Sequence, residues 1–247
     1  MGNIITIGNR KGGVGKSTSV SSLGGLAAAR GMKTLLVDMD SQANLTLNYL
    51  REIPEKTVVD MFGDPKRRLP RVKVKENLYL VPADSDLAGL ENSEMGPEDR
   101  LILAEALEKI RDDYDLIIID IPPDMGWCSI NALSASDYLF VPMLADGKSL
   151  KGVDDIVRLC YKAAGSIRVS GIFFTMFDKR KNIARKYYEK VCGSYGSTVM
   201  QTTIRPCVKL AECAEELTDI ASFDPKCNGT ADYTALLDEM LAVIKGN

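Results

Sequence analysis

Short apolar runs recur along the chain and are separated by polar segments or by segments with helical periodicity. The runs predict β-strands at 4–7, 33–37, 78–82, 115–120, 138–142 and 169–176. The run Leu116–Ile119 is apolar at every position, whereas a strand with one solvated face alternates apolar and polar residues. A continuously apolar strand belongs in a sheet that helices cover on both faces.

Segments with apolar residues at helical spacing lie between and after these runs. They predict helices at 19–29, from Pro97 through 110, and at 129–135, 152–163, 183–192, 209–217 and 230–244. This alternation predicts a single α/β domain, residues 1–247, built on a doubly wound, mainly parallel sheet. In such a sheet a ligand binds at the carboxyl ends of the strands.

The last predicted helix, 230–244, has an acidic polar face that includes Asp232, Asp238 and Glu239. An amphipathic helix that lies on an anionic membrane carries basic residues on that face. We therefore expect this helix to dock on the fold. No run of about 18 apolar residues exists in the sequence, so no membrane-spanning segment is expected.

Composition and charge narrow the possible classes of protein. The 247 residues carry a formal net charge of −3, which excludes a globally basic nucleic-acid binder but leaves room for a local basic patch. The sequence starts directly with a strand and shows no basic-then-apolar leader, so we expect a cytoplasmic protein. It contains no histidine, which excludes imidazole catalysis and histidine metal sites.

Six cysteines are scattered along the chain, and none forms a C-x-x-C pair. We expect reduced, buried thiols, and a metal site or an iron–sulfur cluster is the alternative. They are Cys128, Cys160, Cys192, Cys207, Cys213 and Cys227.

A glycine-rich loop follows the first strand and leads into the first helix, which is the context that a phosphate-binding loop requires. Its backbone N–H groups would point at phosphate oxygens, Lys16 would contact the β- and γ-phosphates, and the Ser17 hydroxyl would ligate Mg²⁺. A glycine-rich turn without a ligand is the alternative, and Arg10 stands where the general motif has its first glycine. The loop consists of Lys11, Gly12, Gly13, Val14, Gly15, Lys16, Ser17 and Thr18.

Two predicted strands end in carboxylates near this loop. Asp40 follows the strand 33–37, and Asp120 ends the strand 115–120 in the pattern of a Walker B segment. Carboxylates at this end of a sheet are placed to hold Mg²⁺, directly or through water, or to position a water near the γ-phosphate. For Asp40 an ordinary acidic turn is the alternative. The stiff segment 121–126 could sense the γ-phosphate.

Two clusters of basic residues stand out. Six cations lie within 66–75, where a solvated edge hairpin and a nucleic-acid or partner contact are the two interpretations. A second cluster surrounds the start of the predicted helix 183–192. A phosphate-binding patch and a solvated helix end are its two interpretations. The cluster comprises Lys179, Arg180, Lys181, Arg185 and Lys186.

Three motifs give the chain a family likeness. K-G-G-V-G-K-S-T at 11–18, L-L-V-D-M-D-S-Q-A-N at 35–44 and I-I-I-D-I-P-P at 117–123 resemble the ParA/Soj ATPases. These P-loop NTPases belong to the deviant Walker A (SIMIBI) group and partition chromosomes and plasmids. The likeness covers nearly the whole chain and matches the short form, which lacks an N-terminal helix-turn-helix domain.

The resemblance implies a slow, partner-stimulated ATPase with ATP and Mg²⁺ as cofactors. Two subunits would form a homodimer around two ATP molecules, and Lys11 would reach the phosphates bound by the partner subunit. Lys16 would contact the phosphates of its own subunit, and Asp40 would position the attacking water. Ser17, Asp40 and Asp120 would hold Mg²⁺. The ATP-bound dimer would bind DNA without sequence preference on the nucleoid, and a ParB-type centromere-binding protein would stimulate hydrolysis and release the dimer.

The resemblance also suggests where the base and the DNA would bind. The family's adenine pocket corresponds to Phe177 and Asp178 and to the segment 204–208, which includes Arg205 and Pro206. The candidate DNA-binding residues are Lys179, Arg180, Lys181, Arg185, Lys186, Arg205 and Lys209.

Three other functions stay open at this point. A MinD-like membrane switch requires a basic amphipathic C-terminal helix. An iron–sulfur relative requires paired cysteines near the switch loops, where Cys128 stands alone. A regulatory module could hold ATP and barely hydrolyse it, although Asp40 and Asp120 favour retained hydrolysis. Asp124, where relatives often carry Ser or Ala, could alter turnover.

Overall fold

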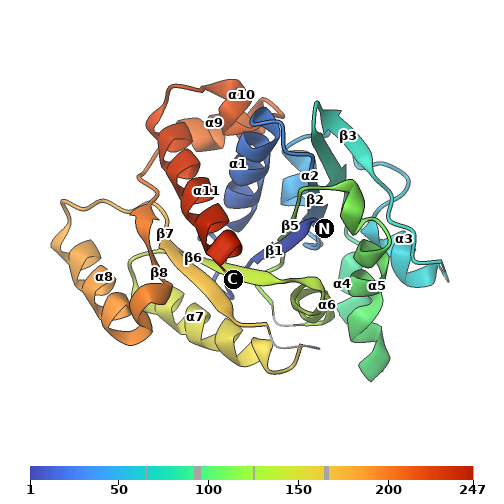
Figure 1. Ribbon diagram of the computed structural model, residues 1–247, viewed down its shortest axis with the longest axis horizontal. Coiled ribbons are helices and arrows are strands. Elements are labelled where there is room, and N and C mark those ends of the chain that lie inside the picture. The colour runs from blue at the N-terminus through green and yellow to red at the C-terminus, as the bar shows by residue number, and fades with distance from the viewer. Residues whose placement is uncertain (65, 92–95, 125, 164–166, 247) are drawn as a thin grey trace.

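The computed structural model describes residues 1–64, 66–91, 96–124, 126–163 and 167–246. These residues form an eight-stranded sheet with the strand order β3-β4-β2-β5-β1-β6-β7-β8 (Figure 1). Within this part of the chain, β3 runs antiparallel to β4, and the other neighbouring strands are parallel. The expected doubly wound, mainly parallel α/β sheet is therefore confirmed.

The strands are short; β2 and β5 are fully buried, and β1 is buried from its second residue on. The strands are β1 (Asn3–Ile7), β2 (Thr34–Asp38), β3 (Val72–Lys75), β4 (Leu78–Val81), β5 (Leu116–Asp120), β6 (Tyr138–Met143), β7 (Val169–Phe174) and β8 (Val199–Thr203). Asp120 at the end of β5 is in register with Ile7 of β1 and with Asp38 of β2. The carboxyl ends of these three strands therefore lie side by side.

Helices connect the strands and follow the last one. The α-helices are α1 (Lys16–Ala29), α2 (Asn44–Leu47), α3 (Val58–Gly63), α4 (Leu87–Glu91), α5 (Ile102–Glu108), α6 (Trp127–Ala135), α7 (Gly147–Cys160), α8 (Asn182–Tyr195), α9 (Lys209–Glu215), α10 (Ile220–Phe223) and α11 (Asn228–Gly246). The short 3₁₀ helices are η1 (Pro97–Leu101), η2 (Arg111–Asp113) and η3 (Gly196–Thr198).

Hydrophobic layers cover both faces of the sheet. One face, with Leu36 and Phe140, packs against α1 and α11, which lie side by side in Figure 1. The other face, with Ile117 and Ile119, packs against α5, α6 and α7. Gly24 of α1 lies so close to the sheet that a Cβ there would meet the Leu36 side chain at 2.4 Å. The glycine is required because α1 approaches β2 this closely.

The final helix docks on the fold, as its acidic face predicts. Tyr233 and Met240 of α11 are buried in the layer that α1 shares, and Arg30, directly after α1, pairs with Asp238 at 2.5 Å. The apolar face of α11 is therefore used inside the protein. Among the helices of the described residues, we find none that is both long and apolar enough to cross a membrane.

Two element boundaries differ from the predicted ones for local reasons. Helix α7 begins at Gly147, well before the expected start at 152, because the Asp146 side chain accepts the N–H of Ser149 at 2.8 Å and caps the helix. Helix α1 begins at Lys16, directly after Gly15, which adopts a left-handed conformation at the N-cap. In both cases the cap sets the helix start, and the apolar pattern begins only later.

The strand β8 is not predicted by the sequence, because its second half is polar and only its first two residues are buried. It lies at one edge of the sheet and contacts α11. The two carboxylate oxygens of Glu239 on α11 accept the backbone N–H groups of Gln201 and Thr202 at 2.7 and 2.9 Å. Tertiary contacts, rather than an apolar run, therefore define this strand.

The opposite edge carries the basic cluster 66–75. Much of its charge is neutralised by neighbours, since Arg68 pairs with Asp64 at 2.7 Å and Lys75 pairs with Asp219. Asp219 is fully buried and caps α10. Internal pairing of this kind favours the edge-hairpin interpretation over a nucleic-acid contact.

Replacing Lys75 by Met should lower the free energy of unfolding by about 3 kcal/mol, because the fully buried Asp219 carboxylate loses its ion-pair partner. Chemical denaturation followed by circular dichroism measures this loss. The control variant Lys73→Met breaks an exposed pair with Glu76 and should cost less than about 1 kcal/mol. Equal losses in the two variants would contradict a structural role for the Lys75–Asp219 pair.

Candidate functional site

The loop between β1 and α1 has the backbone shape of a phosphate cradle. Gly13 and Gly15 have φ angles of 71° and 82°, in the left-handed region that side chains other than glycine rarely adopt. Thr175, just after β7, fixes the loop because its hydroxyl donates to the carbonyl of Val14 at 2.8 Å. The loop leads directly into α1 at Lys16, so it ends at the positive end of the helix dipole.

A pocket of ≈ 540 Å³ opens over this loop. Most residues of the predicted loop line it together with Asp40, and α9 contributes Leu210 and Glu215. Val14 is fully buried, and Lys11 is not among the lining residues. The structure therefore brings the predicted phosphate loop and Asp40 to one cavity.

Three carboxylates are buried at or just after the ends of β2 and β5, and two of them, Asp40 and Asp120, act electrostatically on Lys16. The three carboxylates belong to Asp38, Asp40 and Asp120. Asp38 accepts the backbone N–H groups of Asp40 and Thr46 and the hydroxyl of Thr46, at 3.1, 2.8 and 2.8 Å. It thereby fixes the segment that carries Asp40. The D-x-D pattern at this strand end marks both Asp38 and Asp40 in the sequence, but a role in the site was predicted for Asp40 and not for Asp38.

Burial raises the pKa of Asp38 to about 6, although these hydrogen bonds act in the opposite direction. Burial also raises the pKa of Asp120 well above its usual range, and the neighbouring Asp38 adds to the rise while Ser17 and Lys16 oppose it. Burial lowers the pKa of Lys16, and Asp120 is the carboxylate that opposes this decrease most strongly. The cluster therefore has more negative charge than Lys16 compensates.

Asp120 is the least satisfied member of the cluster. Its side chain is fully buried, and within the described residues neither carboxylate oxygen has a hydrogen-bond partner of acceptable geometry. Buried polar atoms without partners are rare in proteins and call for a ligand, an ion or a water. Two hard oxygen donors close to the Ser17 hydroxyl fit a Mg²⁺ ion that keeps part of its hydration shell.

Lys11 lies in an ion pair of its own. Its ammonium contacts the carboxylate of Asp146 at 2.6 Å, and the Asn9 side chain accepts its backbone N–H at 2.9 Å. Although desolvation opposes the change, hydrogen bonds from Lys11 and from the backbone of Ser149 lower the pKa of Asp146. The structure therefore separates the two lysines of the loop: Lys16 lines the cavity, and Lys11 is held against the start of α7.

A second pocket, of ≈ 470 Å³, unites the four residues predicted to hold the base. Phe177 and Asp178 follow β7, whereas Arg205 and Pro206 follow the neighbouring parallel strand β8. Asp232 of α11 lies on the same pocket and forms an ion pair with Arg205 at 2.7 Å. Adjacent strand ends thus bring together two segments that are distant in the sequence.

The seven candidate DNA-binding cations divide into two groups. Three of them are neutralised internally: Arg180 pairs with Asp178, Arg205 with Asp232 and Lys209 with Glu212. Hydrogen bonds from Arg180 hold the pKa of Asp178 at about 2. The other four form no ion pair within the described part of the chain and lie on α8 or just before it. They are Lys179, Lys181, Arg185 and Lys186.

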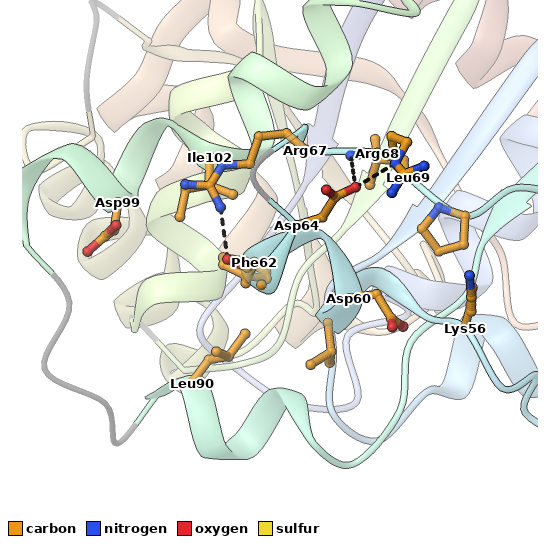
Figure 2. A pocket seen from close by; sticks show the side chains of 13 residues that line it. Lys56, Asp60, Phe62, Asp64, Arg67, Arg68, Leu69, Leu90, Asp99 and Ile102 are labelled. Carbon is orange, nitrogen blue, oxygen red and sulfur yellow. Dashed lines mark hydrogen bonds and ion pairs between the residues drawn. The ribbon is translucent and has the colours of Figure 1, made fainter.

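A third pocket, of ≈ 920 Å³, lies beside α3 at the basic edge of the sheet (Figure 2). Its lining includes the apolar side chains of Phe62 and Leu90. Figure 2 shows Arg68 bonded to Asp64 and Arg67 bonded to the carbonyl of Phe62, at 2.7 and 2.8 Å. The cations at this pocket therefore stabilise the surrounding loop, and none of the residues predicted for the nucleotide lines it.

Comparisons with known proteins identify the family of the chain. Residues 2–168 match a family model described as an AAA domain. The chain is 34% identical to the chromosome-partitioning ATPase Soj of Treponema pallidum (strain Nichols), and the alignment covers 98% of each chain. The resemblance that the motifs predict is therefore confirmed over nearly the full length.

Solved structures share the fold over the same length. The cobyrinic acid a,c-diamide synthase of Mycobacterium smegmatis, with a bound ATP analogue and magnesium, gives a TM-score of 0.83 at 27% identity, covering 99% of this chain and 96% of that one. A Borrelia burgdorferi B31 protein assigned to plasmid partition, bound to AMPPNP, also gives a TM-score of 0.83, at 26% identity over 98% and 99% of the two chains. These bound ligands agree with the predicted cofactors, ATP and Mg²⁺.

Replacing Asp120 by Asn should raise the free energy of unfolding, without nucleotide or divalent cation at neutral pH, by about 1–3 kcal/mol. The raised pKa shows that the charged carboxylate is less favourable in the folded than in the unfolded chain, so removal of the charge should stabilise the fold. Differential scanning calorimetry measures the change. The control Asp112→Asn alters a carboxylate with 81% exposure and should stay within about 0.5 kcal/mol. A less stable Asp120→Asn variant would show that the charge is compensated.

Proposed function

This chain belongs to the ParA/Soj family of chromosome-partitioning ATPases, and from that premise we propose that it works as an ATP-dependent dimerisation switch on DNA. The observation that carries the proposal is the fully buried Asp120 carboxylate, whose pKa is raised by burial and whose charge Ser17 and Lys16, beside the glycine-rich loop, offset only in part. Such a buried carboxyl group is either protonated or paired with a cation. Mg²⁺, when bound with ATP, would offset the charge of the carboxylates and of the phosphates.

The residues of one subunit have distinct roles in this proposal. The backbone N–H groups of residues 12–18 bind the phosphates, and the Lys16 ammonium neutralises their charge. Ser17, Asp40 and Asp120 supply the oxygen ligands for the cation. Asp40 lines the cavity and accepts the N–H of Gln42 at 2.9 Å, so its carboxylate is held in place to orient the attacking water.

The base would occupy the second pocket. Phe177 supplies an apolar surface, since it is largely buried and packs against Phe174 and Tyr188. Asp178, Arg205 and Pro206 supply the rim of the pocket. Family membership and the shared pocket support this assignment.

A second copy of the chain would complete the site. A cation that arrives across an interface neutralises the charge that develops during phosphoryl transfer, and Lys11 has this role in our proposal. Lys11 must first leave Asp146, because the ion pair at 2.6 Å holds it within its own subunit. Met176, which lines the loop pocket, and Val208, which precedes α9, are 51% and 74% exposed. Apolar side chains at this position suit the core of a protein interface.

DNA would bind at the start of α8, where the four cations without ion pairs gather. Contacts between such cations and phosphates carry no sequence information, which fits binding without sequence preference. In this proposal the ATP-bound dimer is associated with the nucleoid, and a ParB-type protein stimulates hydrolysis and releases it. Family membership supports both partners.

Replacing Lys16 by Ala should abolish ATP binding. Replacing Lys11 by Ala should preserve ATP binding and lower hydrolysis by about 10³-fold, the lower end of the range for an arginine finger. Titration with a fluorescent ATP analogue and a phosphate-release assay separate the two effects. The control variant Lys245→Ala, in the last turn of α11, should behave as wild type. Full ATPase activity in both the Lys16→Ala and the Lys11→Ala variant would contradict the proposal.

Removing the four unpaired cations near α8 should weaken DNA binding in the ATP state. The slope of log K against log salt should fall by about 0.9 for each DNA phosphate that the variant no longer neutralises. DNA co-sedimentation across a salt series, with ATP, ADP or no nucleotide, measures both effects. The substituted residues are Lys179, Lys181, Arg185 and Lys186, each replaced by Ala.

A charge-matched control removes four cations from the basic edge instead, and it should leave DNA binding unchanged. Three of these cations already have carboxylate partners. Equal DNA binding in all three nucleotide states would rule out the switch. The control substitutions to Ala are at Lys66, Arg68, Arg71 and Lys73.

A further inference from the structure

Two of the six cysteines approach each other beside the base pocket. Cys207 and Cys227 are 20 positions apart in the sequence, and their sulfur atoms lie 4.0 Å apart. Both are partly exposed free thiols, whereas Cys128, Cys160 and Cys213 are buried. A disulfide bond is about 2.05 Å long, so the sulfurs need to approach by about 2 Å to form one.

The packing around the pair favours this approach. Gly229, in the first turn of α11, leaves room for Cys207, because a Cβ at this position would lie 3.0 Å from the Cys207 sulfur. Cys227 directly precedes α11, and its sulfur accepts the N–H of Thr230 at 3.5 Å.

The chain neighbours of the two cysteines are walls of the base pocket. Arg205 and Pro206 precede Cys207, and Asn228 follows Cys227. All three residues line the pocket, together with Asp232. A covalent bond between the sulfurs would therefore draw two walls of the pocket toward each other.

We propose that Cys207 and Cys227 form a reversible intramolecular disulfide, which narrows the base pocket and lowers the affinity for ATP. The effect on ATP rests on the proposed function, in which this pocket holds the base. The pairing of the thiols rests on their geometry alone.

The oxidant in this proposal is a small-molecule disulfide. The thiolate of one cysteine attacks it, forms a mixed disulfide and releases one small thiol. The thiolate of the second cysteine then attacks the protein sulfur of the mixed disulfide, forms the Cys207–Cys227 bond and releases the second small thiol. The two protein thiols lose two electrons and two protons, and the small disulfide gains them. An excess of the small thiol reverses both steps.

Other cysteines are poorly placed for the same reaction. Burial raises the pKa of Cys160 and of Cys213 to about 11, so little thiolate forms at neutral pH. Cys192 on α8 is partly exposed and serves as a control thiol. Selective cross-linking of one pair is therefore expected.

The first part of the test maps the cross-link in the full chain. The protein is incubated in mixtures of oxidised and reduced glutathione, quenched, and analysed by peptide mass spectrometry. We expect a Cys207–Cys227 peptide pair with a mass lower by two hydrogens, which excess reduced glutathione removes. Cys207→Ser and Cys227→Ser should give glutathione adducts without a cross-link, and Cys192→Ser should keep the cross-link. A cross-link between other cysteines, or glutathione adducts alone, would overturn the proposal.

The second part compares ATP affinity before and after oxidation. Titration with a fluorescent ATP analogue should show affinity reduced by about tenfold in the cross-linked protein, recovery on reduction, and no change when Cys227→Ser is oxidised. Equal affinity of the cross-linked and reduced proteins would overturn the inference and leave the ATP switch intact. Failure of the reduced protein to bind ATP would instead contradict the proposed function.

Discussion

The structure depends on an excess of buried negative charge. Asp38, Asp40 and Asp120 are buried at neighbouring strand ends, and Lys16 is the cation buried with them among the described residues. Burial raises the pKa of both Asp38 and Asp120, so folding works against ionisation at this place. The protein therefore keeps an energetically unfavourable cluster of carboxylates at the point where the glycine-rich loop, the sheet and α1 meet. Such an arrangement is expected where a cation and an anionic ligand bind together, since stability is given up for binding.

The sequence predicted the parts of this site that follow from local pattern. An apolar strand that ends in a carboxylate identified Asp120, and a glycine-rich loop between strand and helix identified Lys16 and Ser17. The parallel sheet then brought their elements together, because parallel strands present their carboxyl ends at one edge. The positions of these residues could be predicted because they depend on strand order and hardly on individual side-chain contacts.

Contacts between distant segments could not be predicted in the same way. The ion pair of Lys11 joins residues that are 135 positions apart, and no periodicity reports it. The same holds for β8, which is a strand because it pairs with β7 and contacts α11. Local charge was also a poor guide: Arg180 and Arg205 are in ion pairs, whereas Lys181, in a similar sequence context, has no ion-pair partner among the described residues. A sequence shows where the cations are along the chain. The fold determines which of them pair with a carboxylate of the protein and which stay available to an anionic ligand.

Both edges of the sheet carry features that disfavour pairing with a further strand, and this has a consequence for how copies of the protein can meet. At one edge, β3 is only four residues long, is irregular in register, and carries lysines along its length. At the other edge, Glu239 occupies the N–H groups of Gln201 and Thr202. Short, charged or covered edge strands prevent sheets from joining into fibrils. Pairing of two copies through their sheet edges is therefore disfavoured, and the loops at the strand ends and the helices are the surfaces that this constraint leaves available.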